Sequence, residues 1–231
     1  MPANRARLLS ALMAEASLVL AVRDRPAGGT GPGGDVHDAV LGPDGPRLVV
    51  ADVKGHGPVA APLAAAFLAA FRDIAAVEDD PVRLARALDV RLGPRMGEED
   101  FVTLLVADFG PDEVRLVNCG HPPPLRIGHR ITPLAPPHPS PPLGLGPRPR
   151  VQRVGLLADQ RLLFHTDGLT EARAADGTHF PLDRHALAAL RAPTPDQALD
   201  QLLDLLRQHT EGTVPADDLT VVLVQSAPAA G

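Results

Sequence analysis

Residues 48–57, LVVADVKGHG, decide how the rest of the chain is interpreted. The apolar run 48–51 predicts a buried strand that ends at Asp52, and two glycines then open the backbone. The alanine-rich stretch 59–77 predicts a helix that is apolar on nearly every side. An unpaired buried carboxylate is costly, so Asp52 needs a cation or a dense shell of hydrogen-bond donors. A capped strand–turn–helix junction without chemistry is the other interpretation.

The strand before this stretch places a second carboxylate near Asp52. Residues 35–41, DVHDAVL, predict a strand, and the turn GPDG at residues 42–45 joins it to the strand that ends at Asp52. The two strands therefore form a hairpin, and pairing across the turn brings Asp35 into the neighbourhood of Asp52.

The rest of the chain alternates between strand and helix patterns. Helices are predicted over residues 5–16, 59–77, 81–92, 183–190 and 195–209, and further strands over 17–22, 101–109, 114–118, 130–134, 150–156, 161–165 and 219–225. The proline-rich segment 135–149 predicts a long surface loop, because proline excludes regular structure. We expect an N-terminal helix within residues 1–16 and a single domain over residues 17–231.

Composition excludes several classes of function. Apolar residues make up 45% of the 231 residues, whereas aromatic residues make up 3%, so platforms for base stacking are missing. The formal charge of −6 disfavours nucleic acid and anionic membranes as partners. The single cysteine, Cys119, excludes an internal disulfide and a cysteine-based zinc cluster. No secretory signal and no apolar span of about 20 residues is present, so we expect a cytoplasmic protein.

Acidic residues recur where predicted strands begin or end. They are Asp35, Asp52, Asp167 and the pair Asp217 and Asp218, and the only lysine, Lys54, cannot neutralise them all. Converging carboxylates repel one another unless hard divalent cations bind between them. Oxygen ligands without cysteine or an HExxH pair favour Mg²⁺ or Mn²⁺ over zinc. Two such ions are the usual means of hydrolysing a phosphoester.

Seven stretches in order resemble the metal-dependent type 2C (PPM) protein phosphatases, in their bacterial SpoIIE-like branch of sigma-factor regulators. They are GGDVHD at 33–38, VADVKGHG at 50–57, FVTLLVADF at 101–109, NCGHPPPL at 118–125, PLGLG at 142–146, HTDGLTEAR at 165–173 and DDLTVVLV at 217–224. The resemblance implies an α+β fold, a four-layer αββα sandwich of two antiparallel sheets flanked by helices. It also implies hydrolysis of phosphoserine or phosphothreonine in proteins by a metal-activated water.

The resemblance also implies roles for individual residues. Asp52 would bridge two Mn²⁺ or Mg²⁺ ions, and the backbone carbonyl of Val53 would help to hold one of them. Asp35 would lie on one side, with Asp167 and Asp217 on the other. Asp218 would be a ligand or a residue that orients a ligand.

Two histidines are candidates for catalysis. His56 would donate a proton to the leaving serine oxygen, or would only order its turn. His121, in the CGHPPP loop, would be catalytic or would order its loop.

Val36 and His37 replace the aromatic pair usual in the family's first motif.

The implied substrate is a phosphorylated anti-sigma-factor antagonist, with no nucleic-acid or membrane partner. Dimerisation through the N-terminal helix and packing of that helix on its own domain both remain open. Two other functions also remain open: a catalytically weak domain of the same fold that binds such a partner, and a hydrolase of small phosphoesters.

Overall fold

The chain divides into two compact units, each assembled from separate stretches of sequence. Unit 1 comprises Met1–Thr30, Pro124–Leu134 and Leu157–Gly231, and unit 2 comprises Gly31–Pro123 and Ala135–Leu156. The computed structural model describes residues 18–27, 33–55, 59–110, 113–157, 159–212 and 217–226. The helix expected within residues 1–16 lies outside these ranges. The single domain expected over residues 17–231 stays a prediction.

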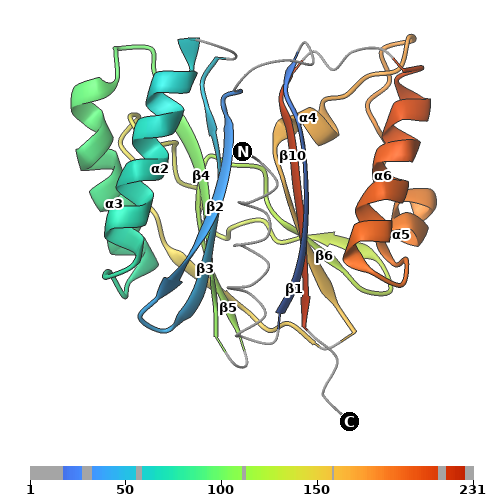
Figure 1. The fold of residues 1–231 in the computed structure, drawn as a ribbon, viewed down its shortest axis with the longest axis horizontal. Coiled ribbons are helices and arrows are strands. Elements are labelled where there is room, and N and C mark those ends of the chain that lie inside the picture. Colours follow the sequence, from blue (N-terminus) through green and yellow to red (C-terminus); the bar gives the residue numbers. More distant parts are fainter. Residues whose placement is uncertain are drawn as a thin grey trace. The chain divides into compact units, whose positions relative to one another are not determined.

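Unit 2 contains an antiparallel sheet with the strand order β2-β3-β4-β5-β8 among the described residues (Figure 1). Its strands are β2 (Asp35–Gly42), β3 (Gly45–Val53), β4 (Val102–Phe109), β5 (Val114–Cys119) and β8 (Val151–Val154). Gly42 pairs with Gly45 across the tight turn that joins β2 to β3. Gly45 has a φ of 133°, a value that residues other than glycine rarely adopt. The predicted hairpin is therefore confirmed.

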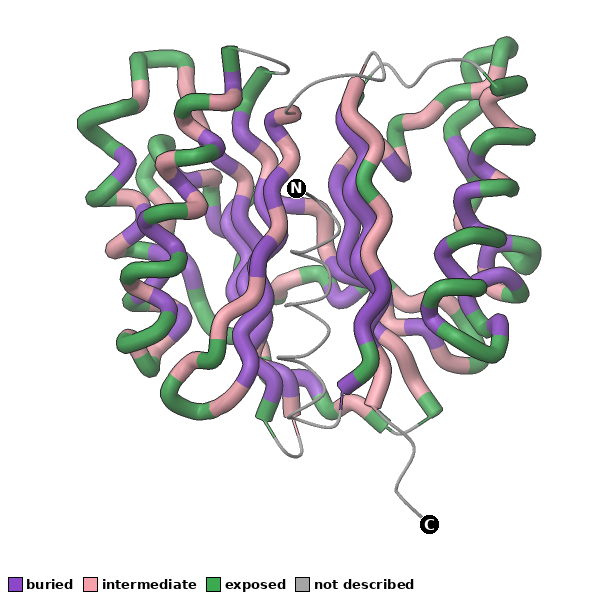
Figure 2. The backbone as a smooth tube through the Cα atoms, in the orientation of Figure 1, coloured by how far each residue is buried: buried purple, intermediate pink, exposed green. Residues whose placement is uncertain are grey.

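Two helices, α2 (Ala61–Ala75) and α3 (Pro81–Leu92), cover one face of this sheet. A short 3-10 helix, η3 (Gly93–Arg95), follows α3. Pro81 occupies the first turn of α3, and the Asp80 side chain accepts a hydrogen bond from the backbone N–H of Val82, which fixes where the helix begins. The helices bury aliphatic side chains and two phenylalanines against alternate residues of the strands. Figure 2 shows that both helices carry buried residues and exposed residues.

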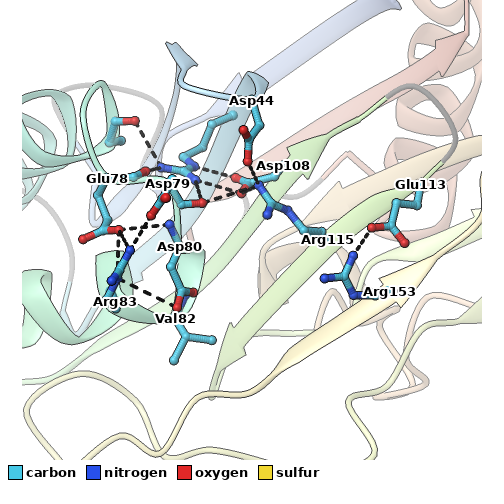
Figure 3. A network of polar contacts seen from close by, with 12 residues as sticks. Asp44, Glu78, Asp79, Asp80, Val82, Arg83, Asp108, Glu113, Arg115 and Arg153 are labelled. Carbon is cyan, nitrogen blue, oxygen red and sulfur yellow. Dashed lines mark hydrogen bonds and ion pairs between the residues drawn. The ribbon is translucent and has the colours of Figure 1, made fainter.

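A buried ion-pair network connects the helices of unit 2 to the end of the sheet at which the turn joins β2 to β3 (Figure 3). Arg47 on β3 is 2% exposed, and its guanidinium donates two hydrogen bonds to Asp108 on β4, one of them 2.8 Å long. It also donates to the backbone carbonyls of Ala75, the last residue of α2, and of Glu78, which follows the helix. Arg115 on β5 donates to the same Asp108 carboxylate. A buried arginine is tolerated here because its donors have partners.

Unit 1 contains a second antiparallel sheet, with the strand order β1-β10-β9-β6-β7 among the described residues. Its strands are β1 (Leu18–Arg25), β6 (Leu125–Ile127), β7 (Ile131–Pro133), β9 (Arg161–His165) and β10 (Leu219–Ser226). The strand β1 pairs along its whole length with β10, from Leu18 opposite Ser226 to Arg25 opposite Leu219.

Helices α5 (Arg184–Leu190) and α6 (Pro195–His209) cover one face of the unit 1 sheet. Leucines on the apolar side of α6 pack with alternate residues of β10, and Thr194 caps the start of the helix. The short helix α4 (Asp167–Thr170) follows β9 directly. No helix among the described residues is long and apolar enough to cross a membrane.

Three local features differ from the prediction. The strand β6 was missed, because three residues after a run of prolines give too short a pattern. The helix α4 (Asp167–Thr170) is not among the predicted helices. The segment 135–149 contains no helix or strand, as expected, but Leu143 within it is fully buried and forms a bridge to Val102. This segment is therefore anchored in the core of unit 2 and does not lie wholly on the surface.

Candidate metal centre

Asp35 and Asp52 face each other across neighbouring strands of unit 2. Asp35 is the first residue of β2, Asp52 lies near the end of β3, and the two are register partners. Residues on either side of Asp52 belong to the cluster that packs under α2 and α3, so both aspartates stand on the opposite face of the sheet. Both are half-buried. The predicted approach of these two carboxylates is confirmed.

Three oxygens surround a cradle beside Gly34. A Cβ atom added to Gly34 would lie 2.5 Å from the carbonyl oxygens of both Val53 and Gly55, and 3.2 Å from Oδ1 of Asp52. Only glycine allows the backbone to come this close. The carbonyl of Val53, which sequence comparison alone suggested as a ligand, thus lies in the same cluster of oxygens as the Asp52 carboxylate.

The one lysine of the chain does not neutralise these carboxylates. The Lys54 ammonium donates to the backbone carbonyl of Glu99 at 2.8 Å, and it lies 5.6 Å from the centre of the Phe101 ring. Its charge is therefore directed to the segment that precedes β4.

Unit 1 brings together the second set of predicted ligands. Asp167 begins α4 directly after β9, and Asp217 lies just before β10, the strand next to β9. Burial raises the pKa of the Asp167 carboxyl, and the negative charges of Asp217 and Glu171 raise that pKa further. Asp167 and Asp217 therefore interact as like charges, as two carboxylates that share a cation would do in its absence.

Asp218 is placed differently from its neighbour. Asp218 is buried, and its Oδ1 accepts a hydrogen bond of 2.7 Å from the backbone N–H of Ala27, after β1. Asp217 is exposed and accepts a hydrogen bond from the backbone N–H of Asp218. A Cβ on Gly168 would lie 2.1 Å from the carbonyl oxygen of Asp218, so glycine is required where α4 meets this segment. Asp218 thus ties the segment before β10 to the residues after β1.

The two histidine candidates have different outcomes. His56 lies outside the described residues, and its role stays a prediction. His121 is buried, and the Asn118 side chain bonds to both its backbone N–H and its carbonyl. The imidazole Nδ1 lies 2.8 Å from the hydroxyl of Thr103 on β4. The Asn118 side chain therefore orders the backbone of this loop, while the His121 imidazole contacts a threonine on the neighbouring strand, a contact that was not predicted. Whether His121 itself orders the loop or takes part in catalysis stays a prediction.

The second aspartate of the first motif, Asp38, lies on the other face of β2 from Asp35. Asp38 is buried, and Nε of Arg72 on α2 donates to its carboxylate at 2.6 Å. Residues two positions apart on a strand lie on the same face, and residues three positions apart lie on opposite faces. The spacing alone therefore places Asp35 and Asp38 on opposite faces. Asp38 anchors α2 to the sheet.

Cys119 is not available as a nucleophile. It is fully buried at the end of β5, and burial raises the pKa of its thiol to about 11. The nucleophilic form of cysteine is the thiolate, which is scarce here at neutral pH. The structure therefore argues against a cysteine-based route to phosphoester hydrolysis.

Each unit carries oxygen donors of the kind that suits a hard divalent cation. Asp35, Asp52 and Val53 belong to unit 2, and Asp167, Asp217 and Asp218 belong to unit 1. Within the described part of the chain, no three His, Cys, Asp or Glu side chains are grouped so as to hold a metal ion. The cradle at Gly34 supplies backbone carbonyl oxygens in addition to a carboxylate, and this is the donor chemistry that Mg²⁺ and Mn²⁺ prefer.

Comparison with known families gives the class of protein. The family model described as Stage II sporulation protein E (SpoIIE) matches residues 42–226. The chain therefore belongs to the SpoIIE family.

Solved structures agree with this assignment. The chain is 29% identical to a structure of the RsbU and RsbW domains of Rv1364c from Mycobacterium tuberculosis, with a TM-score of 0.76. The match covers 92% of this chain and 62% of that one. It matches the SiaA-PP2C domain of Pseudomonas aeruginosa with a TM-score of 0.76 and 21% identity, over 95% of this chain and 89% of that one. It matches the catalytic domain of the serine/threonine phosphatase PstP, solved with two manganese ions, with a TM-score of 0.63 and 20% identity, over 90% and 97% of the two chains.

These matches define the fold class. The predicted αββα fold of the PPM phosphatases is confirmed, since both sheets and their helices match these structures over 90% or more of the chain. The chain is thus a member of the SpoIIE family and has the fold of the PPM-type phosphatase domains. The chain spans just under two thirds, 62%, of the length of the Rv1364c structure.

Proposed function

We propose that this chain is a Mn²⁺- or Mg²⁺-dependent phosphatase that hydrolyses phosphoserine or phosphothreonine in a protein substrate. The observation that carries the proposal is the cluster of Asp52 Oδ1 and two backbone carbonyl oxygens around Gly34, with Asp35 opposite Asp52. A structural role alone does not require carboxylates in register on adjoining strands, where like charges repel. Membership of the SpoIIE family supports the same function.

We infer that residues 17–231 act as one catalytic domain, since the proposed ligands are distributed along that range of the sequence. Asp35, Asp52 and the Val53 carbonyl would hold cations from unit 2, and Asp167 and Asp217 from unit 1. Two divalent ions would supply Lewis-acid chemistry, lowering the pKa of water and stabilising charge on the phosphoryl group. Asp218 would orient its neighbour through its own bond to the Ala27 backbone. His56 remains the candidate proton donor to the leaving oxygen.

The proposed substrate is a phosphorylated anti-sigma-factor antagonist. The support is the likeness to the Rv1364c structure, in which an RsbU domain and an RsbW domain belong to one protein. The PstP structure with two manganese ions supports the choice of metal. A cytoplasmic location, and control by partner proteins or by homodimerisation, belong to the same proposal.

The deciding experiment measures phosphate release from a phosphoserine protein, from an aryl phosphate and from free nucleotides. Each substrate is tested in EDTA, in Mg²⁺ and in Mn²⁺. We expect metal-dependent release from the phosphoprotein that Asp52→Asn abolishes and Asp73→Asn leaves intact, because Asp73 is an exposed carboxylate on α2. Preference for nucleotides would instead favour a hydrolase of small phosphoesters. Metal binding without turnover of any substrate would favour a partner-binding domain.

A further inference from the structure

Three polar side chains stand in a row across the unit 2 sheet, on the face opposite its helices. Asp35 on β2 is the register partner of Asp52 on β3, and Asp52 is in turn the register partner of Thr103 on β4. The residues that flank Thr103, Val102 and Leu104, belong to the cluster under the helices, so Thr103 shares a face with Asp52. Directly opposed side chains have Cβ atoms about 4.5–5.5 Å apart, which is within reach of a hydrogen bond.

Thr103 is held from its other side by His121. The Thr103 hydroxyl lies 2.8 Å from Nδ1 of His121, which is 5% exposed. The Asn118 amide donates to the His121 carbonyl at 2.8 Å, and its oxygen accepts from the His121 N–H at 3.0 Å. These two bonds fix the backbone of the histidine, so the imidazole meets Thr103 in one defined orientation.

The direction of the bond between His121 and Thr103 decides what the threonine does. A hydroxyl has a single proton to donate. If the proton lies on Nδ1 of His121, Thr103 accepts it and its own proton is left to donate to another acceptor. The charged acceptor on the adjoining strand is the carboxylate of Asp52. If Thr103 donates to His121 instead, the pair orders the loop and has no effect on Asp52.

We propose that His121 and Thr103 act as positioning residues that orient the Asp52 carboxylate for a divalent cation. The inference rests on the proposed function, because it assigns a support to the carboxylate that would hold the metal. Residues that hydrogen-bond to metal ligands fix the orientation of those ligands and raise affinity for the metal. The imidazole thus acts through Thr103, and neither residue contacts the cation.

The test measures Mn²⁺ affinity in the absence of substrate, by calorimetry or by the electron paramagnetic resonance signal of free Mn²⁺. We expect Thr103→Val and His121→Leu each to weaken Mn²⁺ binding by about 10- to 100-fold. Thr103→Ser retains the hydroxyl and His121→Asn retains a donor near the Nδ1 position, so both should bind Mn²⁺ within about three-fold of wild type. Thr132→Val on the edge strand β7 is the matched control, because it removes a hydroxyl from a strand of the unit 1 sheet, whereas Thr103 and His121 belong to unit 2.

A second measurement separates positioning from simple loss of structure. If the two residues act in series, the double variant of Thr103→Val and His121→Leu should lose no more affinity than either single variant. Thermal melting in EDTA reports the fold, and a melting temperature near that of wild type is expected for Thr103→Val, because valine has the same branched shape. If His121→Leu does not fold, Thr103→Val with its serine control decides the matter.

Two results would overturn the inference, and they are distinguishable. If wild type binds Mn²⁺ and Thr103→Val binds it equally well, the pair only orders the loop, and the proposed function stands. If wild type and Thr132→Val both fail to bind Mn²⁺, the proposed function itself is wrong, and the positioning role is wrong with it.

Discussion

Asp35 and Asp52 are register partners on the face of the unit 2 sheet that its helices leave uncovered. Like charges directly opposite each other on neighbouring strands destabilise a sheet by roughly 0.2–1 kcal/mol. Without a cation, the pair therefore makes an unfavourable contribution to the free energy of folding. A cation bound between the two carboxylates would make this contribution favourable.

Replacing Asp52 should have opposite effects with and without metal. In EDTA, we expect Asp52→Asn to unfold at the same temperature as wild type or slightly higher, since repulsion worth up to about 1 kcal/mol is relieved. In Mn²⁺, wild type should gain stability and the variant should not, because a ligand that binds the folded state stabilises it. Thermal melts under both conditions make the comparison, with Asp73→Asn as the control. A large loss of stability in EDTA would mean that Asp52 serves the fold.

Gly34→Ala should abolish the oxygen cradle. The new Cβ would lie 2.5 Å from two backbone carbonyl oxygens, so the backbone at Val53 or Gly34 must shift. We expect Mn²⁺-dependent turnover to fall at least about 100-fold, since misplacement by about 1 Å has that effect on a reacting site. Gly155→Ala is the matched control, because no atom lies within 4 Å of its added Cβ. Equal activity of the two variants would remove the cradle from the proposed centre.

Asp167 should make the metal-free protein less stable as the pH rises. Its pKa in the folded state is raised above the ordinary 3.8 by burial and by Asp217, so the folded state holds this proton more tightly than the unfolded state. The contribution to stability is present below the ordinary pKa and is lost as the pH passes through the raised one. Asp167→Asn should therefore gain stability relative to wild type over that interval, as measured by urea unfolding in EDTA.

The control for this pH effect has the opposite sign. The backbone N–H of Thr178 bonds to Asp176 and lowers the pKa of that carboxyl. Asp176→Asn should therefore lose stability relative to wild type as the pH rises. If Asp167→Asn shows the same trend as Asp176→Asn, the repulsion inferred between Asp167 and Asp217 is wrong.

Removing one partner of the pair Arg47 and Asp108 should destabilise the protein strongly. Removing one partner of a buried ion pair costs about 3–5 kcal/mol, because the other charge stays buried without compensation. We expect Arg47→Met to lose stability of this order in urea unfolding. Arg83→Met, which removes a surface arginine paired with Asp79, should lose far less stability, because exposed ion pairs contribute little. The double variant of Arg47→Met and Asp108→Leu should recover part of the loss.

Cys119 should be chemically inert in the folded protein. With a pKa of about 11 and no exposure, its thiol should react with a disulfide reagent only when the protein unfolds. Cys119→Ala should retain metal-dependent turnover, since no step proposed here uses the thiol. Rapid labelling of native protein, or loss of turnover in a folded Cys119→Ala protein, would contradict this interpretation.

The sequence predicted the hairpin of Asp35 and Asp52 because the GPDG turn fixes the register of both strands. The helix α3 was predicted over its full length because Pro81 marks its start. In both cases local chemistry decides the structure. Local patterns also placed Asp167 after one strand and Asp217 before another, but only the structure shows that these two strands are neighbours. Burial, and then the charge of Asp217, raises the pKa of Asp167.

Other features depend on contacts between distant residues and leave no local signal. The pairing of Thr103 with His121 joins β4 to a loop after β5, and nothing in either stretch alone indicates it. The burial of Arg47 depends on Asp108, which lies 61 residues further along the chain. Asp38 is an exception, because its spacing of three from Asp35 along a strand already predicts that the two side chains point to opposite faces.

The pairing of β1 with β10 determines when the unit 1 sheet can form during synthesis of the protein. Strand β1 leaves the ribosome about 200 residues before its partner, since Leu18 pairs with Ser226. Until β10 emerges, β1 and β9 both lack the strand that lies between them, whereas the hairpin of β2 and β3 closes locally. Contacts between residues so far apart in sequence form slowly. Unit 2 should therefore form its sheet while the chain is still growing. Unit 1 should complete its sheet only after β10 has left the ribosome. Until then the edges of β1 and β9 are exposed, and chaperones would have to protect them.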